Sequence, residues 1–338
     1  MTPDRLKTGL QTFISQQAGC EVTVDELVPL AGGASRDSWR VTVTLAGELQ
    51  RLVLRRDLAS SMFAEALSRA DEFALLQAAY DSSVLVPRPR WHSAVPDVVE
   101  TPFLLMDYVE GVSIGRQVVQ MPQLARARER LPQQMAEQLA RIHAIDYRQH
   151  GLCFLPAPRE GLSPAQEAIM QIRETLTALN VQNPALEFGL RWAEQHAPAC
   201  DELTLVHGDF RLGNLIVSED GLSAVIDWEF AHLGDPLEEL GYPCMRDWRF
   251  GVGHLRLGGI ADREPFIAAY ERASGRKVDR AAVDWWEICG NLRWAMACLT
   301  QANRHLSGAD FSVELASLGR RSAEMQLEVL RLIDERGL

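Results

Sequence analysis

Lysine is almost absent from this chain of 338 residues: only Lys7 and Lys277 are lysines among its 34 basic residues. No run of about 18 apolar residues occurs, so we expect no membrane-spanning helix. The N-terminal segment lacks the apolar core of a signal peptide. The six cysteines form no CxxC pair. They therefore indicate reduced thiols in a cytoplasmic protein, and neither a disulfide framework nor a zinc site.

Positive charge is also outweighed by negative charge, since the formal net charge is −12. A nucleic-acid partner is not expected, because phosphate backbones require a basic surface. The negative charge would suit a cationic substrate, but ordinary solubility is the simpler explanation. Apolar residues make up 47% of the chain and charged residues 24%, which is typical of a globular protein.

The sequence changes character near residue 107. Before it, the alternating segment VTVTL and the apolar segment LVLR predict strands, and residues from about Met62 to Tyr80 predict a helix. After it, long segments with helical spacing dominate. We therefore predict an α+β protein with a small β-rich N-lobe, residues 1–107, and a larger, mainly helical C-lobe, residues 108–338. A cleft between two lobes commonly binds a ligand.

The segment LIVSEDGLSAVID carries the clearest local pattern. Asp220 and Gly221 form a two-residue turn of the I′ kind between apolar strands. A hairpin closed at this turn places Asn214 opposite Asp227, with Cβ atoms roughly 5 Å apart. Asp209 lies at the same end, in a His-Gly-Asp turn. Three oxygen-bearing side chains there suit Mg²⁺, although Asp, Asn and Gly also favour ordinary turns.

The two motifs HGDFRLGN and VIDWEFAHLGDP resemble those of the aminoglycoside phosphotransferase and choline kinase superfamily, a branch of the protein-kinase-like fold. Together with LVLRRD, DEFALLQ and FLLMDYVEG, they are most similar to a subgroup of kinase domains associated with acyl-CoA dehydrogenases. Some members of that subgroup phosphorylate hydroxyacyl-CoA thioesters. The resemblance implies a two-lobe kinase-like fold and the transfer of a phosphoryl group from ATP or GTP to a hydroxyl group.

The resemblance also implies roles for the residues around the hairpin. Asp209 matches the catalytic aspartate that orients the acceptor hydroxyl and takes its proton. Asn214 and Asp227 match the residues that hold Mg²⁺ against the phosphate oxygens. We interpret His207 and Asp235 as structural residues, and Arg211 could face a phosphate or the acceptor.

Kinases of this type bind the α- and β-phosphates with a cation, usually a lysine on a strand. Neither lysine of this chain is suitably placed, and Arg55 takes the matching position. Arginine stays protonated and can bind phosphate with two parallel hydrogen bonds. We expect Glu72 on the following helix to pair with Arg55, with Glu65 as the alternative. A surface arginine and a solvated helix face remain the simpler interpretations.

Nucleotide contacts are expected at two further places. The segment Gly32, Gly33, Ala34 and Ser35 could bring backbone N–H groups close to the phosphates. It is not GxGxxG, and an ordinary hairpin turn explains it equally well. Asp107, Tyr108 and Val109 match the hinge between the lobes, whose backbone would contact the adenine edge.

The acceptor is the least determined part of the function. Trp248, Trp285, Trp286 and Trp294 could line its site, although packing between helices is the simpler interpretation. Acidic clusters suited to aminoglycosides are not evident, so a less cationic small-molecule alcohol is preferred. The resemblance to the acyl-CoA dehydrogenase subgroup alone implies a hydroxyacyl-CoA. An antibiotic kinase and a pseudokinase without chemistry are the alternatives. The acceptor, the choice of ATP or GTP, and the oligomeric state stay open.

Overall fold

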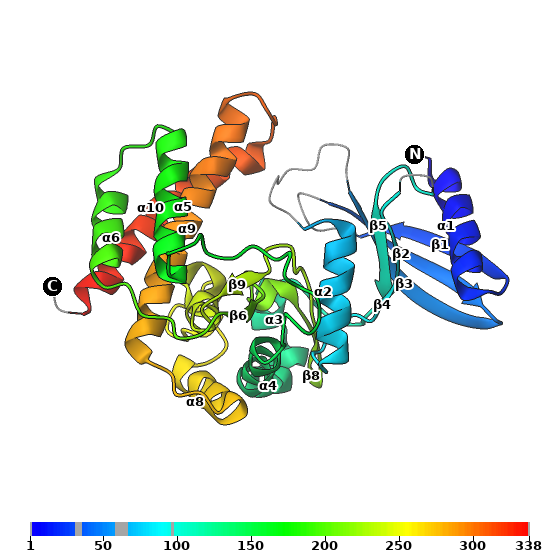
Figure 1. Ribbon diagram of the computed structural model, residues 1–338, viewed down its shortest axis with the longest axis horizontal. Helices are drawn as coiled ribbons and strands as arrows, with labels where there is room; N and C mark the ends of the chain where they lie inside the picture. The colour runs from blue at the N-terminus through cyan, green and yellow to red at the C-terminus, as the bar shows by residue number, and fades with distance from the viewer. Residues whose placement is uncertain (1, 31–35, 58–66, 96–97, 337–338) are drawn as a thin grey trace.

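The computed structural model describes residues 2–30, 36–57, 67–95 and 98–336 (Figure 1). An N-terminal antiparallel sheet precedes a mainly helical C-terminal region, so the predicted α+β architecture is confirmed. Among the described residues, no helix combines the length and apolar character needed to cross a bilayer. The sheet ends at Asp107, while the division into lobes of 1–107 and 108–338 stays a prediction.

Five strands form the N-terminal sheet in the order β1-β2-β3-β5-β4, and every neighbouring pair is antiparallel. The helix α1 (Pro3–Ala18) packs against one face of this sheet, where Leu10 and Ile14 are buried with Leu54 (Figure 1). The strands are β1 (Val22–Pro29), β2 (Arg36–Leu45), β3 (Glu48–Asp57), β4 (Pro89–Ser93) and β5 (Phe103–Asp107).

The opposite face of the sheet packs against α2 (Arg69–Asp81). Leu104 and Met106 of β5 lie in the core that includes α2. Side chains alternate between the faces of a strand. Because Leu54 belongs to the core beneath α1, its neighbour Arg55 on β3 points toward α2. The sheet therefore presents a guanidinium to the side where the helical region lies.

The helix predicted from about Met62 begins later than expected. Residues 58–66 lie outside the described part of the chain, and Leu67 and Ser68 are not helical. The hydroxyl of Ser68 accepts a hydrogen bond from the N–H of Asp71 at 3.1 Å. A serine in this position satisfies an N–H group that has no partner within the helix. The cap sets the start of α2 at Arg69, where apolar spacing alone gave no boundary.

The C-terminal region consists of helices around two short two-stranded sheets (Figure 1). The sheets pair β6 (Thr204–Val206) with β9 (His232–Gly234) and β7 (Leu215–Ser218) with β8 (Gly221–Val225). The helices are α3 (Gly115–Gln120), α4 (Ala125–His143), α5 (Pro164–Ala178), α6 (Pro184–Gln195), α7 (Glu238–Gly241), α8 (Arg263–Ser274), α9 (Arg280–Leu306) and α10 (Val313–Asp334). Short 3₁₀ turns are Pro122–Leu124, Leu212–Asn214, Tyr242–Cys244 and Arg246–Arg249.

Three of the four tryptophans noted in the sequence are buried in the helical region, namely Trp248, Trp285 and Trp286. Trp285 and Trp286 of α9 are buried, and their rings meet edge to face. The indole N–H of Trp285 donates to the carbonyl of Ala193 at 3.0 Å, and that of Trp286 donates to Asp235 at 2.9 Å. Both polar atoms are satisfied within the protein, as buried indoles require. Packing between helices, the simpler interpretation, therefore accounts for both residues.

The hairpin between β7 and β8 forms, but its predicted register is wrong. Glu219 and Asp220 make the loop, Ser218 pairs with Gly221, and a register shift follows at Ile216 and Val217. A type I′ turn needs positive φ at both central residues. Here Gly221 has φ 123°, while Glu219 and Asp220 are not among the residues with positive φ.

The pairing of Asn214 with Asp227 across the ladder is therefore wrong as well. Asn214 lies in the 3₁₀ turn before β7, and its carbonyl accepts from the N–H of Ile226 at 2.9 Å. The two residues thus remain close along the same end of the hairpin. The observed turn is held by a contact with α4, because Gln134 of that helix accepts a hydrogen bond from the N–H of Leu222 at 2.9 Å.

Gly221 should be irreplaceable in this turn. An added Cβ would lie 2.2 Å from Oε1 of Gln134, and φ is 123° there. We expect Gly221→Ala to lower the free energy of unfolding by about 1–3 kcal/mol through strain and the lost contact. Gly253→Ala is the matched control, because a Cβ there meets nothing within 4 Å. Thermal unfolding of both variants tests this, and equal stability would contradict it.

Candidate active site

The segment from His207 to Asn214 connects β6 to β7 and carries Asp209. The Asp209 carboxylate is buried and accepts three hydrogen bonds from side chains. Oδ1 accepts from Nε of Arg211 at 3.0 Å and from the hydroxyl of Tyr242 at 2.8 Å, while Oδ2 accepts from Nδ2 of Asn214 at 2.5 Å. A carboxylate held by three donors cannot rotate freely. Its orientation is therefore set before any ligand arrives.

Backbone contacts hold the loop from beneath. Glu239 of α7 is buried and accepts from the N–H of His207 at 2.9 Å and from that of Gly208 at 3.1 Å. His143 of α4 lies 3.1 Å from the same carboxylate and 2.8 Å from the hydroxyl of Tyr270. One carboxylate thus anchors the loop to two helices.

His207 itself has a structural geometry. Its Nδ1 accepts from the N–H of Asp209 at 3.2 Å, and its Nε2 lies 2.9 Å from the carbonyl of Ile226. The imidazole therefore donates from Nε2 and accepts at Nδ1, which is the arrangement of a neutral ring. Both nitrogens are occupied by backbone groups, so the ring joins the loop to the end of β8.

Asp227 follows β8 in a backbone conformation that is unusual for a residue with a side chain, with φ 68°. Non-glycine residues in this region are uncommon and concentrate at functional sites. The carboxylate is about one-third exposed. It lies one residue beyond Ile226, whose N–H donates to Asn214. The strained backbone turns this carboxylate toward the N-terminal sheet.

Arg55 of β3 bridges two carboxylates from different parts of the fold. Its Nη1 donates to Glu72 of α2 at 2.8 Å, and its Nη2 donates to Asp227 at 2.9 Å. Burial alone would lower the pKa of Arg55, but the charges of Glu72 and Asp227 outweigh it and raise the pKa above its ordinary value. The guanidinium is therefore permanently charged. It joins the sheet, α2 and the end of the hairpin.

Arg211 and Tyr242 surround Asp209 on the side toward the helices. The guanidinium of Arg211 lies over the ring of Trp248, 4.6 Å from its centroid, as in a cation–π contact. Burial disfavours its charge, but Asp209, Tyr242 and Asp227 together favour it, so the pKa of Arg211 is raised. Burial and the neighbouring Asp209 raise the pKa of Tyr242 well above its usual value, so its phenol stays protonated and donates.

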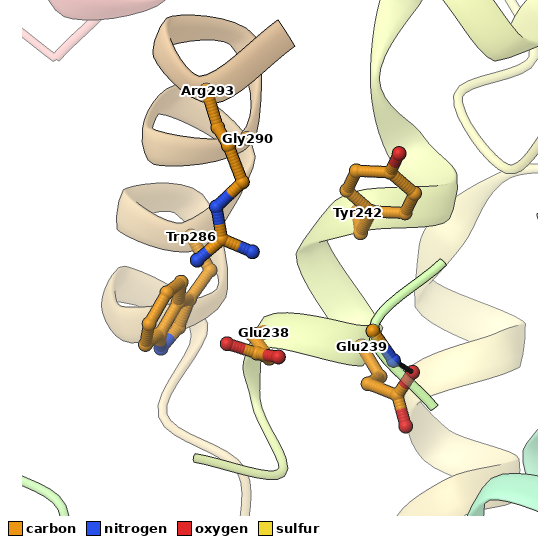
Figure 2. A pocket seen from close by; sticks show the side chains of 7 residues that line it. Glu238, Glu239, Tyr242, Trp286, Gly290 and Arg293 are labelled. Atoms are coloured by element: carbon orange, nitrogen blue, oxygen red, sulfur yellow. Dashed lines mark hydrogen bonds between the residues drawn. The ribbon is translucent and has the colours of Figure 1, made fainter. Parts of the chain in front are cut away.

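A small cavity of about 10 Å³ lies behind the loop, between α7, the turn at Tyr242 and α9 (Figure 2). Its lining includes Glu238, Glu239 and Tyr242 on one side and Trp286 and Arg293 on the other. This volume suits about one water molecule. It cannot hold a nucleotide or an acceptor.

A larger groove of about 550 Å³ lies elsewhere, between the C-terminal end of α4 and the start of β6. It is lined by polar and charged side chains such as Asp146, Glu202 and Arg276. None of the predicted site residues lines it. Asp209 and the other residues of its loop are therefore not part of the lining of this groove.

The remaining predicted residues are the glycine-rich segment with Glu65, the hinge, and Asp235. Gly32, Gly33, Ala34, Ser35 and Glu65 lie outside the described residues. The hinge backbone is already partly engaged: the N–H of Asp107 donates to Arg88 and that of Tyr108 donates to Arg51, both at 2.9 Å.

Asp235 is the last of these residues. It is buried and accepts from the N–H of Leu237 and from the indole of Trp286, both at 2.9 Å. Burial raises its pKa. With both oxygens engaged inside the protein, this carboxylate braces the segment that leads into α7.

The sequence interpretation missed Glu239, Tyr242 and Arg69. Arg69 is buried on α2 and contacts both Asp57 and Glu72. The pair Glu238-Glu239, separated from the LGDP segment by Leu237 alone, is the one signal that could have been used, because adjacent acidic residues in an apolar stretch need partners. Tyr242 lies 33 residues after Asp209, and no local pattern links them.

The donor set around the hairpin fits Mg²⁺. Nδ2 of Asn214 donates to Asp209, which leaves its carbonyl oxygen as the group available to a cation. Among the described residues, no cluster of three or more His, Cys, Asp or Glu side chains could hold a metal ion. A magnesium ion bound by Asn214 and Asp227 would therefore depend on phosphate oxygens for the rest of its coordination, as Mg²⁺ sites in nucleotide enzymes do.

Comparison with known proteins identifies the family. A model of the phosphotransferase enzyme family matches residues 26–286, and the chain belongs to this family. Acyl-CoA dehydrogenase family member 10 of Mus musculus is 30% identical over 198 residues, which is 58% of this chain and 18% of that protein. The Arabidopsis thaliana protein IBR3, described as an acyl-CoA dehydrogenase, is 28% identical over 326 residues. The match covers 89% of this chain and 38% of that protein. The chain thus spans well under half of these relatives.

Solved structures show the same fold. A Ralstonia eutropha protein described among the aminoglycoside phosphotransferases superposes with a TM-score of 0.75 at 21% identity, covering 97% of this chain and 98% of that one. The aminoglycoside phosphotransferase APH(4)-Ia, in complex with AMP-PNP and hygromycin B, superposes with a TM-score of 0.62 at 17% identity. The superposition covers 96% of this chain and 98% of that one. The kinase-like two-lobe fold implied by the sequence motifs is confirmed.

Glu239 should be essential for the stability of the loop. In Glu239→Gln one of the two oxygens that accept from His207 and Gly208 becomes an N–H₂ group facing a donor. We expect a loss of about 2–3 kcal/mol in the free energy of unfolding, the scale of a charged hydrogen bond left unmade. Glu219→Gln in the exposed hairpin loop is the control and should change stability by less than about 0.5 kcal/mol. Urea unfolding of both variants measures the difference, and similar values would contradict it.

Proposed function

We propose that this chain transfers the γ-phosphoryl group of ATP or GTP to the hydroxyl of a small-molecule alcohol, with Asp209 as the residue that orients the hydroxyl and accepts its proton. One observation supports this most strongly. Asp209 and Asn214 are hydrogen-bonded at the same end of the hairpin at which Asp227 meets Arg55. Phosphoryl transfer depends on positioning and on neutralising charge, and this arrangement supplies both.

Asp209 has one acceptor position to offer the substrate. An ionised carboxylate accepts about four hydrogen bonds. Arg211 and Tyr242 use two of them on Oδ1, and Asn214 uses one on Oδ2. The remaining lone pair of Oδ2 would receive the acceptor's O–H. The three donors fix the orientation of the carboxylate, and a loose transition state depends more on such positioning than on base strength.

The nucleotide would be held by charge and by backbone groups. Arg55 would exchange its contact with Asp227 for the α- and β-phosphates when Mg²⁺ binds to Asn214 and Asp227. The bound metal would neutralise charge on the phosphate oxygens during transfer. Residues 32–35 are proposed to cover the phosphates. At the hinge, Val109 would contact the adenine edge, because the N–H groups of Asp107 and Tyr108 are engaged.

For the acceptor we propose a hydroxyacyl-CoA. The side of Asp209 toward the helices offers a guanidinium on an indole, Arg211 over Trp248. Carboxylates nearby already have partners: Asp247 binds Arg321 and the indole of Trp294. A polycationic aminoglycoside would require free carboxylates, whereas phosphate groups and a thioester carbonyl suit an exposed edge of arginine. The acyl-CoA dehydrogenase relatives support the same choice.

Phosphorylation of an aminoglycoside is the second candidate, supported by structural neighbours that contain hygromycin B or spectinomycin. We expect purified protein to consume nucleotide with hydroxyacyl-CoA substrates and to ignore aminoglycosides and macrolides. Coupled measurement of nucleotide diphosphate, with mass spectrometry of the acceptor for one added phosphoryl group, distinguishes them. Turnover with an antibiotic alone would overturn the proposed acceptor and leave the phosphotransfer.

Asp209→Ala should abolish most of the turnover. Loss of general-base assistance and of hydroxyl orientation together reduces kcat by about 10²–10⁴-fold. Nucleotide binding, followed by titration with a non-hydrolysable triphosphate, should change little. Asp220→Ala, at an exposed carboxylate in the hairpin loop, is the control and should retain full activity. Unchanged turnover in Asp209→Ala, or none in the wild type with any acceptor, would contradict the mechanism and favour a pseudokinase.

A further inference from the structure

Arg69 belongs to a chain of alternating charges in which Arg69 and Glu72 are buried. Its Nε donates to Asp57 of β3 at 2.8 Å, and its Nη1 contacts Oε2 of Glu72. Oε1 of Glu72 then accepts from Arg55 at 2.8 Å. The chain therefore runs from Asp57 through Arg69 and Glu72 to Arg55, and continues from Arg55 to Asp227.

The geometry follows from the two elements that carry these residues. Arg55 and Asp57 lie two apart on β3 and face the same side of the sheet. Arg69 and Glu72 lie three apart on α2 and share one face of the helix. Two opposite-charge pairs therefore join the strand and the helix side by side. In one pair the strand carries the positive charge, and in the other the helix carries it. A single pair would leave α2 free to pivot, whereas two pairs fix its rotation and its distance from the sheet.

Burial makes this arrangement rigid. The side chains of Glu72 and Arg69 are 0% and 2% exposed. A buried carboxylate is stable only when its charge is paired and hydrogen-bonded, and removing one partner leaves an uncompensated charge. With Oε2 occupied by Arg69, Glu72 offers Arg55 one oxygen in one orientation. Arg55 thus keeps Nη1 on Glu72 and has Nη2 left to move between Asp227 and a phosphate.

We propose that Arg69 is a positioning residue for nucleotide binding: by occupying the second oxygen of Glu72, it fixes the direction in which Arg55 presents its guanidinium to the α- and β-phosphates. This inference rests on the proposed phosphotransfer, since it assigns Arg69 a task in that same site. Arginine is needed in both positions because one guanidinium can contact two carboxylates at once, which the compact ammonium of lysine does less well.

Binding of a magnesium complex of a non-hydrolysable triphosphate, compared with binding of the nucleoside alone, tests the proposal. Arg69→Gln should weaken the triphosphate by about tenfold or more, the scale of a misplaced binding group. It should leave nucleoside affinity unchanged. Arg69→Lys, which retains the charge, should recover part of the loss. Leu10→Ala controls for stability, because it removes buried packing beneath the opposite face of the sheet and should change neither affinity.

A double-mutant cycle with Arg55→Gln separates positioning from a general loss of structure. If Arg69 acts through Arg55, the double variant should bind triphosphate no more weakly than Arg55→Gln alone. Independent, multiplying losses in the cycle, or full triphosphate affinity in Arg69→Gln, would overturn the role of Arg69 while the proposed function stands. Wild-type protein that binds no magnesium triphosphate would overturn both.

Discussion

The ion pairs of Arg55 are the interaction on which the rest of the site depends. One guanidinium joins Glu72 on α2 to Asp227 at the end of the hairpin, and its own strand belongs to the N-terminal sheet. A strand, the helix that follows it and a hairpin 172 residues further along the chain are thereby brought to one point. The buried setting strengthens these contacts, because charges interact more strongly where water is excluded. Without Arg55, the link from Glu72 to Asp227 through a shared cation would be lost.

Arginine supplies this kind of compensation throughout the molecule. Glu287, buried on α9, is paired with Arg249, Arg256 and Arg263. Burial is the largest influence on this carboxyl and raises the pKa of Glu287 despite the three arginines. The planar guanidinium can contact several carboxylates and backbone carbonyls at once, which explains how a chain with two lysines can bury many acidic side chains. The predominance of arginine over lysine therefore matches the number of buried carboxylates that the fold has to pair.

Sequence patterns located most of the fold and part of the site. Alternation along LVLR put Arg55 on one face of its strand, and helical spacing placed Glu72 on the helix that the same face meets. The hairpin register was wrong because Gln134, far away in the chain, contacts the turn and favours a glycine with positive φ after a two-residue loop. The predicted start of α2 was wrong because the N-cap residue Ser68, and not apolar spacing, sets where the helix begins. Tyr242 and Glu239 were missed since their partners are distant in sequence.

By itself, the sequence determined the α+β architecture, the absence of a suitably placed lysine, and the motif that carries Asp209, Asn214 and Asp227, because periodicity and spacing are local properties. Only the tertiary structure decided which side chains hold these residues. The contacts of Asp209 with Tyr242, of His207 with Glu239 and of Arg55 with Asp227 span 33, 32 and 172 residues. Contacts of this length are set by how the helices pack against the sheets, and no local pattern in the chain encodes them.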